Sequence, residues 1–181
     1  MKQFRSLLMA VVLVACGTGS EPTTTTSTTT TSTAPQPQTV AVTAIDYAFV
    51  GLPASVPAGT TFTLSNDSDT EVHELVAIRL PDDETRPVSE LVQLSPEEFG
   101  AFFPLVKTVI IAPPAADGFA VEGTGELSEP GRYALICVIP TGADPDEYMT
   151  AAAEAEGGPP DVAGGPPHIV HGMFAEIVVE G

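Results

Sequence analysis

The amino-acid sequence predicts an all-β domain over residues 40–181, a Greek-key β-sandwich with short helical insertions. Six short runs in this region are rich in β-branched and aromatic residues, and turn residues such as Gly and Pro bound them. Long connections separate the runs and no internal repeat is evident, which points to a sandwich. Hydrophobic residues make up 43% of the chain, enough to supply a core, so disorder throughout is excluded.

The expected strands can be followed along the chain. The first, 40–50, alternates apolar and polar residues and ends at Leu52-Pro53. A second run, around Phe62 and Leu64, follows the turn Pro57-Ala58-Gly59. The remaining expected strands are 72–80, 108–112, 132–139 and 174–179, the last of which closes the chain.

Two short helices are expected between the strands. Ser95-Pro96-Glu97-Glu98 has the pattern of a capping box with proline at the first helical position, so a helix should begin there. Asp144-Pro145-Asp146-Glu147 has a similar pattern and leads into YMTAAAEAE, in which Ala and Glu favour a helix. The cluster Gly157-Gly158-Pro159-Pro160 is expected to end this second helix.

Residues 1–15 are predicted to be a lipoprotein signal peptide. Lys2 and Arg5 make a basic start, and the apolar run 7–15 is about half as long as a bilayer-spanning helix needs to be. Leu13-Val14-Ala15-Cys16-Gly17 resembles the lipobox of bacterial lipoproteins, in which cleavage precedes the Cys and the Cys is acylated. The resemblance implies that a lipidated Cys16 anchors the protein to the bilayer. The alternative is a plain secretory peptide with an incidental Cys.

Residues 16–39 are predicted to be the lipidated Cys followed by a disordered stalk rich in Thr and Pro. The segment 17–39 has no large apolar residue and cannot join a core. As a flexible coil, the stalk would span about 25–30 Å r.m.s. and hold the domain off the membrane. The predicted location is therefore extracytoplasmic, lipid-anchored to the cell membrane.

The chain is strongly acidic, with 24 Asp and Glu against 6 Lys and Arg and a formal net charge of −18 at pH 7. Two of the six bases lie in the signal peptide, so the mature chain is more acidic still. Binding to nucleic acid or adsorption to anionic lipid needs clustered Lys and Arg, so both are poor candidates. The acidic excess is expected to be a solvated surface, which can also attract a basic redox partner.

The sequence does not favour an enzyme. It has no Gly-x-Ser-x-Gly elbow, no His-Glu-x-x-His, no Gly-rich phosphate loop and no Cys-x-x-Cys. A protease dyad of Cys137 and His168 is conceivable, but Cys137 lies within an apolar strand, and no Asn or Asp is evidently placed to orient the histidine.

Few residues of the domain can bind a transition metal. The candidates are Cys137, His73, His168, His171, Met149 and Met173. Type-1 copper requires one thiolate, two imidazoles and a weak axial thioether, and this set supplies them. Cys137 has no disulfide partner in an oxidising compartment, where an unpaired thiol is usually protected or metal-bound. The alternative is that Cys137 serves as a small buried hydrophobic residue.

Three motifs resemble those of the cupredoxins, the blue-copper family that includes plastocyanin. Residues 131–137 (GRYALIC) are similar to the family's Gly-x-Tyr-x-x-x-Cys strand. Residues 167–173 (PHIVHGM) are similar to its Pro-His-x-x-x-Gly-Met segment, and 66–73 to the turn before its first His ligand. The resemblance implies one type-1 copper ion with the ligands His73, Cys137, His168 and axial Met173. In this register His168, not His171, is the ligand.

Two departures from the plastocyanin pattern concern the surroundings of the site. Residues 138–167 separate Cys137 from His168, where plastocyanin-like proteins have only a few residues. A loop excursion that returns to the site is expected, with Pro140 and Pro166-Pro167 marking its ends. Glu74 follows the first His, where plastocyanin has Asn, so the contacts around the ligands are expected to differ from those of plastocyanin.

The sequence thus predicts a membrane-anchored, extracytoplasmic copper protein that transfers single electrons with a redox partner protein at the outer face of the membrane. The loop around His168 is expected to present an imidazole edge to that partner. The alternatives are a copper carrier that hands metal to another protein, and a metal-free cupredoxin-like interaction module. A separation above about 6 Å between Cys137 and His168 would favour the module, because metal bonds measure about 2.0–2.3 Å each.

Overall fold

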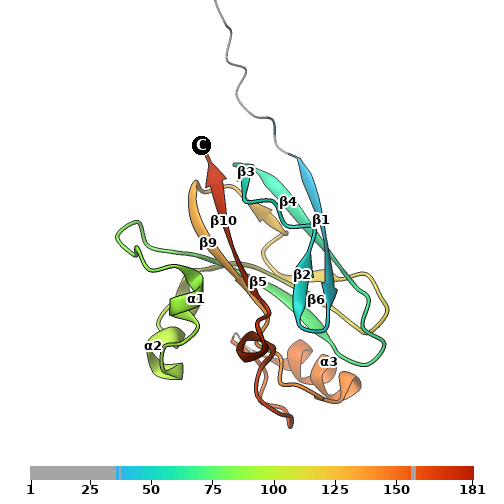
Figure 1. Ribbon diagram of the computed structural model, residues 1–181. Coiled ribbons are helices and arrows are strands. Elements are labelled where there is room, and N and C mark those ends of the chain that lie inside the picture. The colour runs from blue at the N-terminus through green and yellow to red at the C-terminus, as the bar shows by residue number, and fades with distance from the viewer. Residues whose placement is uncertain (1–35, 37, 156–157) are drawn as a thin grey trace, which may run out of the picture. The chain divides into compact units, whose positions relative to one another are not determined.

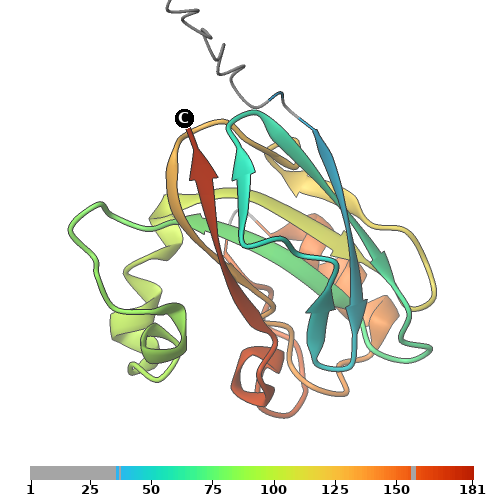
Figure 2. The same cartoon turned by 45° about the horizontal axis from the view of Figure 1, so that its top comes forward.

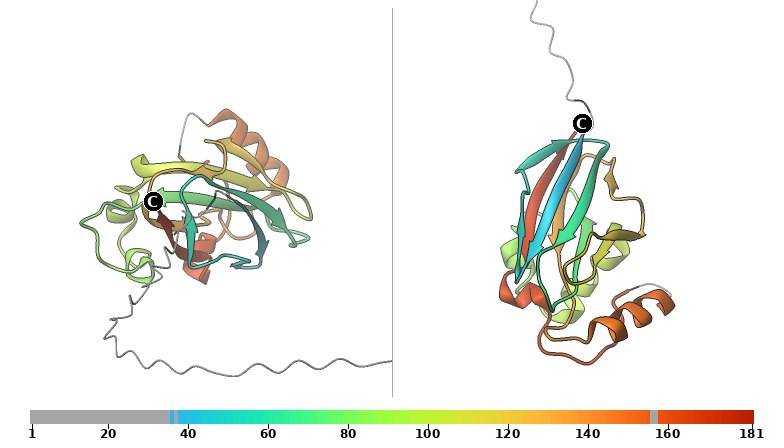
Figure 3. Two further views of the ribbon diagram at one scale, coloured as in Figure 1. Left: turned by 90° about the horizontal axis from the view of Figure 1, so that it is seen from above. Right: turned by 90° about the vertical axis from the view of Figure 1, so that its right-hand side faces the viewer.

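The computed structural model describes residues 36, 38–155 and 158–181, and these form a mostly β-strand sandwich of two sheets with a few short helices (Figure 1). The all-β sandwich predicted from the sequence is therefore confirmed. The side view in Figure 3 shows the strands of the two layers. The predicted signal peptide (1–15), Cys16 and most of the predicted stalk (16–39) lie outside the described residues.

The elements are bounded as follows. The first sheet contains β1 (Thr39–Ile45), β2 (Ala48–Val50), β4 (Thr60–Asn66) and β8 (Glu126–Leu127). The second sheet contains β3 (Ser55–Pro57), β5 (His73–Arg79), β6 (Val106–Ala112), β7 (Phe119–Glu122), β9 (Gly131–Ile136) and β10 (Phe174–Glu180). The helical segments are α1 (Val88–Leu91), α2 (Pro96–Gly100), η1 (Phe103–Leu105), α3 (Pro145–Glu154) and η2 (His168–His171).

The chain crosses between the sheets in the manner of a Greek key. The strand orders of the described residues are β2-β1-β4-β8 and β3-β10-β9-β5-β6-β7, so β4 leads across to β5 and β8 to β9. β9 lies between β5 and β10 and is antiparallel to both. The start of β5, the end of β9 and the start of β10 therefore meet at one end of the sandwich.

The six-stranded sheet is buried on both faces along β5. Leu75 and Ala77 belong to the main core between the two sheets, whereas Val76 and Ile78 belong to a second cluster on the outer face. This pattern follows from the alternation of side chains along a strand. The second cluster also includes Leu91 of α1, so the α1–α2 segment covers part of this outer face, as Figure 2 illustrates.

Both predicted helices are present. In α2 the Ser95 hydroxyl accepts from the backbone N–H of Glu98, and the Glu98 carboxylate accepts from the backbone N–H of Ser95, which makes the predicted capping box. The side chain of Asp144 caps α3 by accepting from the backbone N–H of Glu147. No helix among the described residues is long and apolar enough to cross a bilayer.

The structure adds elements that the sequence did not predict. The run 40–50 is divided into the antiparallel pair β1 and β2, which is joined at Asp46-Tyr47. β3, β7 and β8 are strands of two to four residues. β7 is exposed along its whole length at the edge of the six-stranded sheet.

Candidate metal centre

Three segments that are distant in sequence converge where β5 begins and β9 ends. His73 is the first residue of β5, Cys137 directly follows β9, and His168 begins η2 just before β10. Because neighbouring antiparallel strands run in opposite directions, the start of one lies beside the end of the next. The register confirms this arrangement, since Ile136 pairs with both Val76 and Phe174.

The side chains of His73, Cys137 and His168 form one cluster. The two Nδ1 atoms of the histidines are 3.1 Å apart, and Cys137 Sγ lies 3.3 Å from His168 Nδ1. The three donor atoms all lie within 4.8 Å of one another, and all three residues are fully buried. Three of the four predicted ligands are thus brought together, and His168, not His171, is the member from η2.

Carboxylates outside the cluster determine how the two imidazoles are oriented. His73 Nε2 lies 3.3 Å from Asp46 Oδ1, and His168 Nε2 lies 3.3 Å from Glu71 Oε2. An ionised carboxylate can only accept a hydrogen bond, so each Nε2 carries the N–H and each Nδ1 presents its lone pair to the cluster. Metal-bound histidines commonly donate their second N–H to a carboxylate in this way. The cluster therefore fits a cation that accepts both lone pairs.

Burial keeps both imidazoles neutral. It lowers the pKa of His73, and it lowers the pKa of His168 to about 4, where a proton on nearby His73 would oppose a second positive charge. Neutral imidazole is the form that binds metals. Both histidines therefore have their lone pairs available at neutral pH.

The Cys137 thiol also fits a metal ligand. The backbone N–H of Glu74 donates to Cys137 Sγ over 3.4 Å, a contact that can stabilise a thiolate. Burial raises the pKa of this thiol, and the negative charge of Glu74 raises it further. Without a metal, the thiol therefore stays protonated. A bound cation would offset this cost and release the proton, as happens when thiols coordinate metals. One thiolate with two imidazoles is the three-donor set of a type-1 copper site.

Met173 lies in the segment that joins His168 to β10. Its backbone N–H donates to the carbonyl of His168, and its own carbonyl accepts from the N–H of Cys137. The side chain is fully buried in the main core. Gly172, which ends η2, has a φ of 104°, a left-handed conformation that glycine adopts without strain. The turn thus ties the predicted axial ligand to two other members of the site.

The segment 138–167 is a loop excursion that returns to the site, as predicted. Pro140 and Pro167 form an isolated antiparallel bridge, and the N–H of Thr141 donates to the carbonyl of Pro166. The N–H of His168 in turn donates to the carbonyl of Ile139. These bonds hold both ends of the excursion together next to the metal centre. Between them the chain forms α3.

The prediction that the loop presents an edge of His168 to a partner is wrong. His168 is fully buried, because Glu71 accepts from its Nε2 and the ring of Tyr47 packs against it with 4.9 Å between centroids. Tyr47 also contacts the ring of His171, again at 4.9 Å, and His171 is exposed. His171 and Val170, which is 59% exposed, therefore lie at the surface beside the site.

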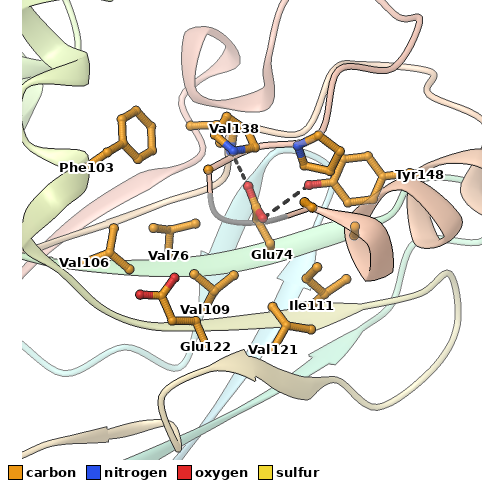
Figure 4. A pocket seen from close by; sticks show the side chains of 15 residues that line it. Glu74, Val76, Phe103, Val106, Val109, Ile111, Val121, Glu122, Val138 and Tyr148 are labelled. Carbon is orange, nitrogen blue, oxygen red and sulfur yellow. Dashed lines mark hydrogen bonds between the residues drawn. The ribbon is translucent and has the colours of Figure 1, made fainter.

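Glu74 lies beside Cys137, and its carboxylate contacts the inserted loop. Its side chain is buried, Oε1 accepts from the backbone N–H of Val138 (3.1 Å), and Oε2 accepts from the Tyr148 hydroxyl of α3 (3.4 Å), as Figure 4 shows. Burial raises the pKa of Glu74 to about 7, although both hydrogen bonds lower it. The acid in place of the plastocyanin Asn thus contacts the inserted loop, not solvent.

Sequence reasoning missed Asp46, Glu71 and Tyr148 as neighbours of the site. Asp46 carries no local signal, because acidic residues are abundant in the chain. For Glu71, the one available hint was its position two residues before His73. Asn66, within the predicted turn motif, has a visible role: its Nδ2 donates to the carbonyls of Glu71 and Ala112 and joins the turn to β6.

Comparison with known proteins yields three similar solved structures. Auracyanin B is 20% identical with a TM-score of 0.44, and the match covers 81% of this chain and 91% of that one. Dithionite-reduced auracyanin from the photosynthetic bacterium Roseiflexus castenholzii is 14% identical with a TM-score of 0.45, covering 81% and 99%. Auracyanin A, a "blue" copper protein from the green thermophilic photosynthetic bacterium Chloroflexus aurantiacus, is 20% identical with a TM-score of 0.38, covering 58% and 89%. No protein-family model and no curated protein matches the chain.

Proposed function

We propose that this protein binds one copper ion through His73 Nδ1, His168 Nδ1 and Cys137 Sγ, with Met173 as the axial ligand, and acts in one-electron transfer. The observation that carries the proposal is the buried cluster of three donors whose imidazole N–H groups point outward to carboxylates. Two imidazole nitrogens 3.1 Å apart are close enough to bind one ion together, because metal–nitrogen bonds measure about 2.0 Å each.

The residues of the chain supply a site that is built before metal arrives. A copper ion bound by these residues would supply the one-electron couple between Cu(I) and Cu(II). Asp46 and Glu71 hold the imidazoles, and the N–H of Glu74 holds the sulfur. Backbone hydrogen bonds fix Cys137, His168 and Met173 relative to one another. Because these supports do not involve the metal, little needs to rearrange when the oxidation state changes.

The partner and the location follow from charge and from the amino terminus. All four bases of the described residues are ion-paired: Arg79 with Asp82, Arg86 with Glu84, Lys107 with Glu129 and Arg132 with Glu176. Most of the acidic residues that the structure describes have no such partner, so a redox partner with a basic surface is favoured. Acylation of Cys16 would hold the domain at the outer face of the cell membrane. Replacing Cys16 by Ser is expected to move the protein from the membrane fraction to the soluble one.

The two alternatives differ from electron transfer in what they require of the site. A carrier needs ligands that an acceptor protein can reach, and full burial of His73, Cys137 and His168 disfavours that exchange. A metal-free module would tolerate separated ligands, whereas Cys137 Sγ lies 3.3 Å from His168 Nδ1, well below about 6 Å. Electron transfer is therefore the function that the geometry supports best.

The decisive experiment is optical titration of the purified full chain with Cu(II) in detergent. We expect one equivalent to produce the intense visible charge-transfer band of a Cu–thiolate bond, and Cys137→Ser to abolish it. His168→Ala and His171→Ala form a matched pair. The first should lose the band and the second should keep it, because only His168 lies in the cluster. A colourless wild-type protein, or a band that survives Cys137→Ser, would overturn the proposal.

A further inference from the structure

A cavity of about 250 Å³ lies between α3 and the outer face of the six-stranded sheet. Strands β5, β6 and β7 form one side of it, and α3 forms the other (Figure 4). It is separate from the metal cluster: none of His73, Cys137 or His168 is among its lining residues. An apolar cavity of about 150 Å³ is large enough for benzene, so this one has room for a substituted aromatic ring.

The lining combines aliphatic walls with hydrogen-bond acceptors. Most of the wall is supplied by aliphatic side chains such as Val76, Val109 and Ile111. The charged side chains are two carboxylates: Glu74, which is 4% exposed, and Glu122 on the β7 side, which is exposed. No Lys or Arg of the described residues lines the cavity.

The hydrogen-bonding capacity of Glu74 is only partly used. Each of its oxygens accepts one hydrogen bond, from Val138 N–H and from the Tyr148 hydroxyl, whereas a carboxylate can accept about four. The Tyr148 hydroxyl already donates to Glu74, so the charged and hydroxyl groups of the lining offer acceptors to a ligand. A ligand that binds here must therefore supply a hydrogen-bond donor to Glu74.

The charge of the lining decides what kind of donor fits. An anion would meet the buried Glu74 carboxylate with no base to compensate it, a costly arrangement at low dielectric, and the exposed Glu122 would add a weaker repulsion. A cation gains from the same carboxylates, and a hydrogen bond to a charged partner is roughly twice as strong as a neutral one. The strongly acidic chain adds a field of the same sign.

We propose that this cavity binds a small ammonium ion with an apolar, ring-sized body. The ammonium donates to the Glu74 carboxylate, and the body packs against Val76, Val109 and Ile111. The backbone N–H of the same Glu74 donates to Cys137 Sγ, so the occupant lies one residue from the metal-binding thiol. Binding itself requires no metal and goes beyond the proposed electron transfer.

The test compares three probes of similar shape on the metal-free full chain: 2-phenylethylammonium, 2-phenylethanol and 3-phenylpropanoate. Isothermal titration calorimetry should show binding of the ammonium, at least tenfold weaker binding of the alcohol, and none of the carboxylate. The tenfold margin corresponds to the loss of one charged hydrogen bond. Failure of the ammonium to bind at millimolar concentration, or equal binding of the carboxylate, would refute the proposal. Neither result bears on copper, which the optical titration tests separately.

Variants locate the binding. Glu74→Gln keeps the shape and removes the charge, so ammonium affinity should fall at least tenfold, whereas Glu126→Gln on β8 of the other sheet should leave it unchanged. Ala152 of α3 lines the cavity and the exposed Ala153 does not. Ala152→Leu should therefore fill the cavity and block binding, and Ala153→Leu should not, which gives a second measure if Glu74→Gln fails to fold. Retained affinity in a folded Ala152→Leu protein would place the probe elsewhere and overturn the assignment.

Discussion

The two carboxylates that orient the imidazoles provide a matched comparison. Glu71 and Asp46 each lie 3.3 Å from a histidine Nε2, but the Glu71 side chain is 12% exposed and that of Asp46 is 51% exposed. We therefore expect Glu71→Gln to weaken copper binding much more than Asp46→Asn. Both changes keep an oxygen that can accept a hydrogen bond from the imidazole N–H, and both remove the negative charge.

The expected sizes follow from solvent screening. Two unit charges 4 Å apart interact by about 1 kcal/mol in water and about 4 kcal/mol at an effective dielectric of 20. The interaction of the half-exposed Asp46 with a bound ion should be close to the value in water, and that of the more buried Glu71 should be closer to the value at a dielectric of 20. Loss of a carboxylate that orients a ligand typically costs 10–100-fold in metal affinity, or about 1.4–2.7 kcal/mol. We expect this range for Glu71→Gln and a loss below tenfold for Asp46→Asn.

The assay is competition for copper against a chromophoric chelator at fixed pH and ionic strength. Glu126→Gln, which removes a charge far from the site, controls for the general effect of net charge on copper affinity. The thermal unfolding midpoint of each metal-free variant shows whether the fold is intact. Equal losses for Glu71→Gln and Asp46→Asn, or a larger loss for Asp46→Asn, would refute the reasoning from burial.

Three further outcomes are expected. Tyr148→Phe leaves one oxygen of buried Glu74 without its donor, and should lower the unfolding free energy of the metal-free protein by about 1–3 kcal/mol in urea titrations. The hydrogen bond from Arg132 lowers the pKa of Glu176 from its ordinary value of 4.5. The stability that this ion pair contributes is therefore complete above about pH 4.5 and is lost as the pH falls through the lower pKa of the folded state. Glu176→Gln should reduce the decrease of the unfolding midpoint in this acid range. Met173→Leu should keep the visible copper band and raise the reduction potential measured by redox titration, because loss of the axial donor destabilises Cu(II) more than Cu(I).

The sequence was most informative where one residue type has one strong physical preference. The proline and capping residues of Ser95-Pro96 and Asp144-Pro145 marked both longer helices, because side-chain caps act locally. The strands that form the centre of the six-stranded sheet were also predicted, because buried strands need continuous apolar runs. The cluster of His73, Cys137 and His168 followed from the scarcity of Cys and His, combined with the resemblance to the cupredoxins.

The remaining features depend on tertiary contacts that leave no local trace. β7 and β8 are too short to show a strand pattern, and β7 is also exposed along its whole length. Asp46 reaches His73 only because the first run turns back on itself, a turn that the alternation of 40–50 concealed. The full burial of His168 results from Tyr47 and Glu71 covering a ring that the loop alone would expose.

The closed ends of the excursion have a consequence for how this protein can vary. The bridge between Pro140 and Pro167, with the bonds of Thr141 to Pro166, fixes the distance from Cys137 to His168 whatever lies between. Chain length beyond such a closure costs little, since each doubling of a loop adds only about 0.6 kcal/mol of closure entropy. The segment inside the bridge, which includes α3 and one wall of the cavity, can therefore change in length while the ends near Cys137 and His168 stay closed.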